Sequence, residues 1–213
     1  MIKAILFDFD GTLINTNNVI IESYNYCLKE HLNYEPTKEE IVKLFGEPLL
    51  DSMKRYDEKN AEEMCTTYKK HNEVIHDSMV EEFKGVREAL EFFKKKEIIL
   101  AIVTSKRLDM VNRGMKLINI NNFFDIIVTL ESTNIHKPNG EPALEACRKL
   151  GILPEEAIMV GDSHNDILCG RNAGCKTCLV SYTAIPIEDL KEYKPDYIID
   201  NLFELDGIIN SLK

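Results

Sequence analysis

Two aspartates stand two residues apart near the start of the chain, where Asp8 and Asp10 follow the short apolar run Ala4–Phe7 and precede a Gly-Thr pair. A continuous apolar run of this length is typical of a buried strand. Two negative charges at the end of such a strand cost desolvation and mutual repulsion. Because a bound cation would offset both costs, this stretch is the first candidate for a site that carries chemistry.

Three further polar groups follow later apolar runs: Thr104 in AIVTSK, Lys137 in HKPNGEP and Asp162 in IMVGDSHND. If the runs form a parallel sheet, their carboxyl ends meet at one edge, and these groups converge with Asp8 and Asp10. Carboxylates, a hydroxyl and an ammonium group together suit a hard cation and an anion, and oxygen ligands favour magnesium over zinc or copper. A phosphoryl group bridged to Mg²⁺ meets these needs, with a carboxylate as nucleophile and water hydrolysing the resulting aspartyl-phosphate.

The elements that would position these groups can be read along the whole chain. Strand-like apolar runs occur at residues 4–7, 98–103, 126–128, 157–160, 177–180 and 197–199. Nearly all are continuous rather than alternating, as in strands buried on both faces. Helical periodicity fills the intervening segments, for example in the stripe Val86, Ala89, Leu90 and Phe93. The alternation predicts an α/β fold: a Rossmann-like parallel sheet with helices on both faces.

One region interrupts this alternation. Between residues 15 and 82 we find only helical patterns and expect no strand, with helices near 19–32, 37–45, 49–56 and 61–79. We therefore expect a core domain formed by residues 1–14 and 83–213, and an inserted all-helical domain at 15–82. An insertion after the first strand lies at the edge where open α/β sheets bind ligands, so we expect it to act as a lid.

Each of these residues also has an ordinary structural interpretation. Asp8 and Asp10 could form a solvated strand end with a turn-forming Asp-Gly pair, and Thr104 could cap the following helix. Lys137 could be a surface-loop lysine before a proline. Asp162 could be a helix N-cap, with the nearby Asp166 in the first helical turn, where the helix dipole favours it, and these two roles are compatible with metal binding.

The bulk composition restricts the class of partner. The 213 residues carry a formal net charge of −10, which argues against nucleic acid or an anionic membrane as the main partner. No apolar stretch approaches the ~20 residues of a membrane span, and we expect no signal peptide before the first strand. We therefore expect a cytoplasmic protein, either a monomer or a weak dimer.

Four motifs together resemble those of the haloacid dehalogenase superfamily: FDFDGTL, the threonine of AIVTSK, the Lys-Pro of HKPNGEP, and GDSHND. The resemblance spans the whole chain, and the insertion resembles the small helical cap of phosphoglycolate-phosphatase-like members. The stretches DGTLINTNN, FGEPLLDSM and AIVTSK are more closely similar to a group of bacterial inorganic pyrophosphatases. In that group the cap supplies substrate specificity, which makes Glu47 of FGEPL the candidate lid residue near the substrate.

The resemblance also implies roles for the motif residues. Asp8 is implied to be the nucleophile and Asp10 the general acid/base, while Thr104 and Lys137 hold the transferring phosphoryl group. Ser105, beside Thr104 at an expected helix entrance, is a further candidate because backbone N–H groups at such positions suit phosphate.

The metal ligands are implied by the same resemblance. Asp162 and Asp166 would anchor Mg²⁺, with Asp8 and the backbone carbonyl of Asp10 completing the site.

The sequence thus predicts a Mg²⁺-dependent phosphohydrolase whose first candidate substrate is inorganic pyrophosphate. The alternatives are a phosphatase of 2-phosphoglycolate or another small phosphomonoester, then a phosphomutase of the β-phosphoglucomutase kind, then a non-catalytic phosphate-binding regulator. The regulator is disfavoured because such a protein need not retain Asp8, Asp10, Lys137 and Asp162 together.

Overall fold

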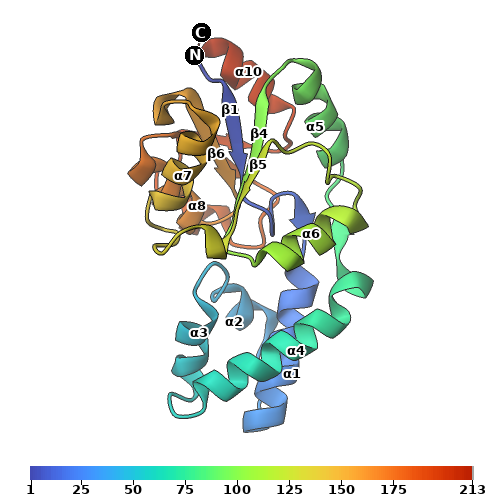
Figure 1. Ribbon diagram of the computed structural model, residues 1–213. Coiled ribbons are helices and arrows are strands. Elements are labelled where there is room, and N and C mark those ends of the chain that lie inside the picture. Colours follow the sequence, from blue (N-terminus) through green and yellow to red (C-terminus); the bar gives the residue numbers. More distant parts are fainter. Residues whose placement is uncertain (213) are drawn as a thin grey trace. The chain divides into compact units, whose positions relative to one another are not determined.

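A six-stranded parallel sheet is the central feature of the computed structural model, which describes residues 1–212 (Figure 1). The strand order is β5-β4-β1-β6-β7-β8, and every neighbouring pair is parallel. The strands are β1 (Ala4–Phe7), β4 (Ile99–Val103), β5 (Ile126–Val128), β6 (Ala157–Gly161), β7 (Lys176–Val180) and β8 (Tyr197–Ile199). The predicted α/β class is confirmed.

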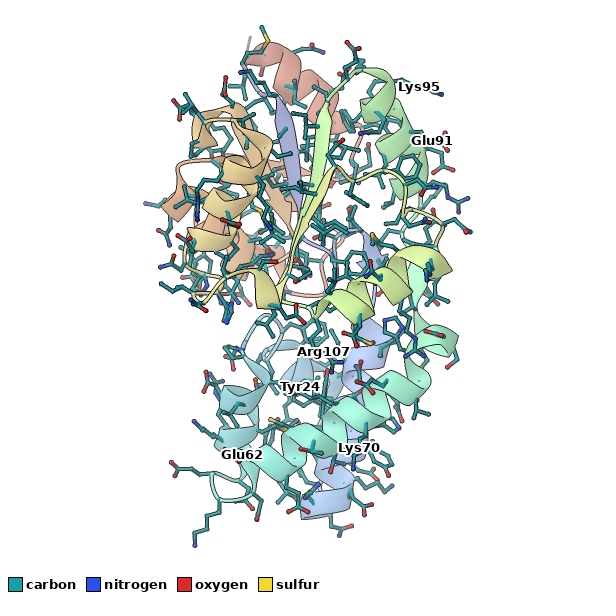
Figure 2. The ribbon with its side chains drawn as sticks, viewed as in Figure 1. Tyr24, Glu62, Lys70, Glu91, Lys95 and Arg107 are labelled. Carbon is teal, nitrogen blue, oxygen red and sulfur yellow. The ribbon has the colours of Figure 1, made fainter. Side chains whose placement is uncertain are left out.

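Helices surround this sheet and bury it. They are α5 (Val86–Lys95), α6 (Leu108–Leu117), α7 (Glu141–Leu150), α8 (His164–Ala173), α9 (Ile187–Lys191) and α10 (Glu204–Ser211), with short 3₁₀ turns at Leu130–Ser132 and Pro154–Glu156. On α5, Glu91 and Lys95 point to solvent while the opposite side of the helix packs against β4 (Figure 2). A sheet covered in this way needs apolar side chains on both faces, which explains the continuous apolar runs.

β1 occupies the middle of the sheet, between β4 and β6, and its four side chains are fully buried. Ala4 and Leu6 belong to a cluster with apolar side chains of α7 and α8. Because successive side chains of a strand point to opposite faces, Ile5 and Phe7 pack on the other face. The strand that carries the first two aspartates is therefore anchored on all sides.

Residues 16–81 form a second compact unit, while residues 1–15 and 82–213 form the unit that contains the sheet. The second unit consists of α1 (Asn17–Leu32), α2 (Lys38–Val42), α3 (Leu49–Tyr56) and α4 (Ala61–Met79). The longest two, α1 and α4, pack against each other. Tyr24, labelled in Figure 2, is buried between them and meets the Tyr68 ring edge-on at a centroid distance of 5.0 Å.

Two short strands occur where the sequence predicts none. β2 (Ile14–Asn15) and β3 (Glu81–Glu82) form a separate two-stranded sheet. The expectation that residues 15–82 hold no strand is therefore wrong at both ends of that segment. Two residues are too few to display an alternating pattern, and the side chains of β3 are both charged and exposed, so burial leaves no trace in the sequence here.

Within residues 1–212, no helix combines the length and the apolar composition that crossing a membrane would require.

Candidate active site

The carboxyl ends of the three central strands carry the polar residues singled out from the sequence. Asp8 follows β1, Thr104 follows β4, and Asp162 follows β6. The sheet ladder continues past two of these strand ends, because the N–H of Asp8 donates to the carbonyl of Val160 (2.8 Å) and that of Thr104 to the carbonyl of Val128 (2.9 Å). The backbone under these side chains is therefore fixed by the sheet itself.

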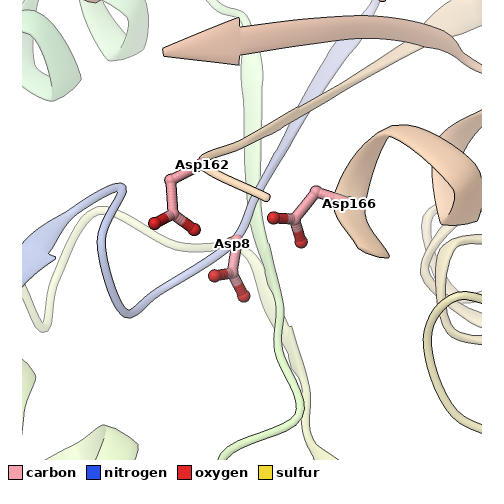
Figure 3. A group of neighbouring side chains, drawn as sticks. All are labelled: Asp8, Asp162 and Asp166. Carbon is pink, nitrogen blue, oxygen red and sulfur yellow. The ribbon is translucent and has the colours of Figure 1, made fainter. Parts of the chain in front are cut away.

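Three carboxylates, those of Asp8, Asp162 and Asp166, lie close together at this edge (Figure 3). All three are buried, and each offers an oxygen that lies within 4.8 Å of those of the other two. The pKa of Asp8 is raised to about 7 and that of Asp162 well above its ordinary value, mainly by burial and in part by the neighbouring Asp166 carboxylate. These shifts indicate a surplus of negative charge in a poorly hydrated place.

Lys137 is the buried cation of this cluster. Its Nζ donates to Asp8 Oδ1 (2.8 Å) and to Asp166 Oδ1 (2.7 Å), and only 4% of its side chain is exposed. Burial alone would lower the pKa of Lys137, but the Asp166 and Asp8 carboxylates outweigh it and raise that pKa. One ammonium group thus faces three buried carboxylates, so the charges do not balance.

Asp166 lies in the first turn of α8, where it is part of the helix cap. Its Oδ2 accepts hydrogen bonds from the N–H (3.0 Å) and the Oγ–H (2.7 Å) of Ser163, the N-cap residue. With Oδ1 on Lys137, both of its oxygens already have protein donors. Asp162 is less engaged, since the hydroxyl of Thr183 approaches its Oδ2 at 3.4 Å. Asp8 and Asp162 therefore have the more available oxygens for a metal ion.

Two glycines make room for the carboxylates. Gly11 has a φ of +77°, and a Cβ on it would lie 2.1 Å from Asp162 Oδ2. A Cβ on Gly161 would lie 2.2 Å from both Cβ and Cγ of Asp166. Any side chain at either position would displace an acidic group from the cluster.

The cluster fits a hard divalent cation. Its donors are carboxylate oxygens, which Mg²⁺ and Ca²⁺ prefer. Its surplus of negative charge is what such an ion would neutralise. Burial and crowding raise the pKa values of Asp8 and Asp162, and a bound cation would lower both.

Asp10 has a different partner. Its Oδ1 lies 2.6 Å from Nζ of Lys106, a residue in the bend between β4 and α6. The N–H of Lys106 in turn donates to Oγ1 of Thr104 (3.2 Å), which links Asp10 to the end of β4. We did not single out Lys106 as a site residue from the sequence, although its place two residues after Thr104 in AIVTSK was an available signal.

Ser105 and Glu47 stand apart from these contacts. Ser105 is exposed in the bend, and α6 begins only at Leu108, so the expectation of a helix entrance at Ser105 is wrong by three residues. The cause is the extended Arg107, which serves as the N-cap. Glu47 belongs to the second unit, where its carboxylate accepts from Nη2 of Arg55 (2.7 Å) and Oγ of Ser52 (3.3 Å).

Of the residues selected from the sequence, the structure therefore brings together Asp8, Asp10, Thr104, Lys137, Asp162 and Asp166 in the unit that contains the sheet. Glu47 is the one that it assigns to the other unit.

Comparison with known proteins covers nearly the whole chain. A family model described as "Haloacid dehalogenase-like hydrolase" matches residues 5–180. A Clostridium perfringens protein named "Putative pyrophosphatase PpaX" is 49% identical over 212 residues, which is 100% of this chain and 99% of that protein. The "Pyrophosphatase PpaX" of Bacillus cereus (strain AH820) is 40% identical over 211 residues, covering 99% of this chain and 98% of its own.

Solved structures share the fold. One from Haemophilus somnus, described as a predicted phosphoglycolate phosphatase, superposes with a TM-score of 0.84 at 27% identity and covers 97% of both chains. The resemblance therefore includes the helical second unit as well as the sheet.

Proposed function

This chain belongs to the haloacid dehalogenase-like hydrolase family, and on that premise we propose that it is a Mg²⁺-dependent phosphohydrolase whose substrate is inorganic pyrophosphate. The observation that carries the proposal is the buried group of Asp8, Asp162 and Asp166 with Lys137 in contact with two of them. The choice of substrate is supported by the names of the relatives at 40–49% identity.

In the first step, a carboxylate oxygen of Asp8 attacks the phosphorus of one phosphoryl group. The bond from that phosphorus to the leaving oxygen breaks, the electron pair stays on the leaving oxygen, and Asp10 supplies the proton that this oxygen takes up. Lys137 and the hydroxyl of Thr104 hold the oxygens of the transferring group and offset its charge. The product of this step is an aspartyl-phosphate, the acyl phosphate of Asp8.

In the second step, a water molecule attacks the same phosphorus while Asp10, now ionised, accepts the proton of the water. The bond between phosphorus and the Asp8 oxygen breaks, which restores the Asp8 carboxylate and releases phosphate. Asp10 thus ends each cycle with the proton that it began with, and it acts as acid and base in turn.

The metal ion would be held by Asp8, Asp162 and the backbone carbonyl of Asp10, with Asp166 in support. When bound, Mg²⁺ supplies charge neutralisation for the phosphoryl oxygens and for the crowded carboxylates. Burial raises the pKa of Asp8 to about 7 even with Lys137 beside it, so the added positive charge of the ion would keep this nucleophile ionised.

We assign the helical unit the role of a cap that closes over the substrate and excludes water during transfer. Glu47 is its candidate contact to the substrate, and the backbone N–H of Ser105 is a candidate phosphate ligand of the sheet unit. We further propose that the enzyme acts in the cytoplasm as a monomer or weak dimer, on a small phosphorylated substrate.

A phosphatase of 2-phosphoglycolate is the second candidate. The likeness to the Haemophilus somnus structure, described as a predicted phosphoglycolate phosphatase, favours it, and the mechanism would be unchanged.

The deciding experiment compares phosphate release from pyrophosphate, 2-phosphoglycolate and glucose 1-phosphate, each with Mg²⁺ and with a chelator. We expect Mg²⁺-dependent release with a clear preference for pyrophosphate, and a loss of at least about 10⁴-fold in kcat for Asp8→Asn. The exposed Asp189 supplies the matched control, because Asp189→Asn makes the same chemical change away from the site. Preference for an organic phosphate would show that pyrophosphate is not the substrate. Phosphate release that survives in Asp8→Asn would overturn the mechanism.

A further inference from the structure

Two lysines contact different aspartates at the edge of the sheet. Lys137 contacts Asp8 and Asp166, and it is the cation of the buried cluster. Lys106 contacts Asp10, with 2.6 Å between Nζ and Oδ1. The mechanism above uses Lys137 but gives Lys106 no task, although only 15% of the Lys106 side chain is exposed to solvent.

Lys106 is held in place from several sides. Its N–H donates to Oγ1 of Thr104 (3.2 Å), and its carbonyl accepts from the N–H of Leu130 (3.2 Å). Its Nζ lies 5.7 Å from the centroid of the Phe9 ring, within the range of a cation–π contact. An exposed lysine loses side-chain entropy when it makes an ion pair, whereas this one is already ordered by its surroundings.

The place of Lys106 identifies what it would meet during the reaction. Asp10 must reach the leaving oxygen in order to protonate it, so the leaving group lies against Asp10. A cation 2.6 Å from Asp10 therefore stands next to the leaving group, whereas Lys137 contacts the nucleophile Asp8.

Leaving groups differ in charge. A phosphomonoester of a neutral alcohol releases that alcohol without charge once it is protonated. Pyrophosphate releases inorganic phosphate, which remains negatively charged after it has taken up a proton. A fixed ammonium group beside the leaving oxygen stabilises the second kind of product and the transition state that leads to it, but does little for the first.

We infer that Lys106 is a specificity-determining residue that selects substrates whose leaving group is itself a phosphate, namely phosphoric anhydrides. The inference rests on the proposed function and deepens it, since it locates part of the preference for pyrophosphate in the sheet unit and not in the cap. When the leaving phosphate is present, it takes the place of the Asp10 carboxylate as the anionic partner of Lys106.

A simpler role would be to hold Asp10 in position. In that case the loss of Lys106 would impair every substrate equally, because Asp10 protonates the leaving oxygen of each. The ratio of activities on two substrates therefore separates the two roles, and the activity on one substrate does not.

The experiment compares kcat/KM for pyrophosphate and for glycerol phosphate, whose leaving group is a neutral alcohol. Lys106→Met keeps the apolar stem over Phe9 and removes the charge, Lys106→Arg keeps a charge, and Lys116→Met on the exposed side of α6 is the control. We expect Lys106→Met to lower kcat/KM for pyrophosphate about 100-fold and that for glycerol phosphate about threefold, with Lys106→Arg restoring most of the preference.

Equal losses on both substrates in Lys106→Met would overturn the inference and leave Lys106 as a positioning residue. Unchanged activity on pyrophosphate would also overturn it. Failure of the proposed function looks different, because it would appear in the unmodified enzyme as an absence of phosphate release from pyrophosphate.

Discussion

The carboxylates of the sheet unit and the Glu47 carboxylate of the helical unit are held in opposite ways. Asp8 is buried, and its lysine partner is 129 residues away along the chain. Glu47 is partly exposed, and its partners Arg55 and Ser52 follow within eight residues, in α3. The first arrangement exists only in the complete fold, whereas the second requires little more than one helix and the loop before it.

This difference shows how strongly each kind of contact indicates a function. A local ion pair beside a helix contributes little to stability and needs no further explanation. Buried acidic groups that crowd together destabilise the fold unless a cation joins them, so their presence points to a ligand. The following predictions test whether this contrast holds.

The largest effect should come from Lys137→Met. Removing the ammonium leaves Asp8 and Asp166 buried without their cation, so we expect the metal-free protein to lose about 4 kcal/mol of unfolding free energy at pH 8 and kcat/KM to fall at least about 10³-fold. Denaturant unfolding and steady-state kinetics measure the two effects. Lys149→Met, which removes a partly exposed partner of Glu145, is the control. A loss no greater than that of the control would show that the buried carboxylates depend on their cation no more than an exposed ion pair does.

Gly11→Ala should have the next largest effect. The new Cβ would overlap Asp162 and would force a side chain into left-handed backbone, so we expect a loss of about 3 kcal/mol and a weaker response to Mg²⁺. Gly151 also has a positive φ but has nothing within 4 Å of the Cβ position. Gly151→Ala should therefore lose only about 1 kcal/mol. Similar losses for the two variants would show that Asp162 is free to move aside.

Mg²⁺ should stabilise the protein more at pH 8 than at pH 5.5. The pKa of Asp8 is about 7 in the folded protein and 3.8 ordinarily, so the folded state binds this proton more tightly than the unfolded state. In a chelator, stability should consequently fall as the pH rises from about 4 to about 7. Mg²⁺ binds the ionised carboxylates, and at ten times its Kd it should add about 1.4 kcal/mol at pH 8 and less at pH 5.5.

Thermal unfolding at the two pH values, with Mg²⁺ and with a chelator, measures this difference. Asp8→Asn lacks the titrating group, so its metal-free stability should vary less between pH 4 and pH 7. Equal stabilisation by Mg²⁺ at both pH values would exclude Asp8 as a metal ligand.

The smallest effect should come from Glu47→Gln. The exposed pair with Arg55 is worth less than about 1 kcal/mol, so unfolding should hardly change. If Glu47 reaches the substrate as proposed, KM for pyrophosphate should rise about tenfold. Arg55→Gln breaks the same pair but keeps the carboxylate, and it should leave KM nearly unchanged. An unchanged KM in Glu47→Gln would show that Glu47 does not contact the substrate and only pairs with Arg55.

The sheet could be predicted from the sequence because its strands are continuous apolar runs, the pattern that burial on both faces produces in a central strand such as β1. The runs at Ala4–Phe7, Ile126–Val128 and Tyr197–Ile199 have the same limits in the structure as in the sequence pattern. The pairing of β2 with β3 left no such trace, since it involves only two residues on each side.

Part of the candidate site could also be predicted from the sequence. That groups after successive parallel strands meet at one edge follows from topology, so Asp8, Thr104 and Asp162 could be grouped in advance. The contact between Lys106 and Asp10 joins residues 96 positions apart, and it depends on a bend whose shape no local pattern specifies. The engagement of both Asp166 oxygens likewise required the coordinates of Ser163 and Lys137.

The central position of β1 also has a consequence for how the chain is made. β1 leaves the ribosome first, but its neighbours β4 and β6 consist of residues 99–103 and 157–161. At ordinary rates of synthesis the second neighbour emerges about 10–30 s later. During that interval an apolar strand ending in two aspartates has no sheet to join, while the four helices of residues 16–81 already have one another. Nascent chains stopped before residue 157 should therefore contain a folded helical unit attached to an unfolded strand that needs protection from aggregation.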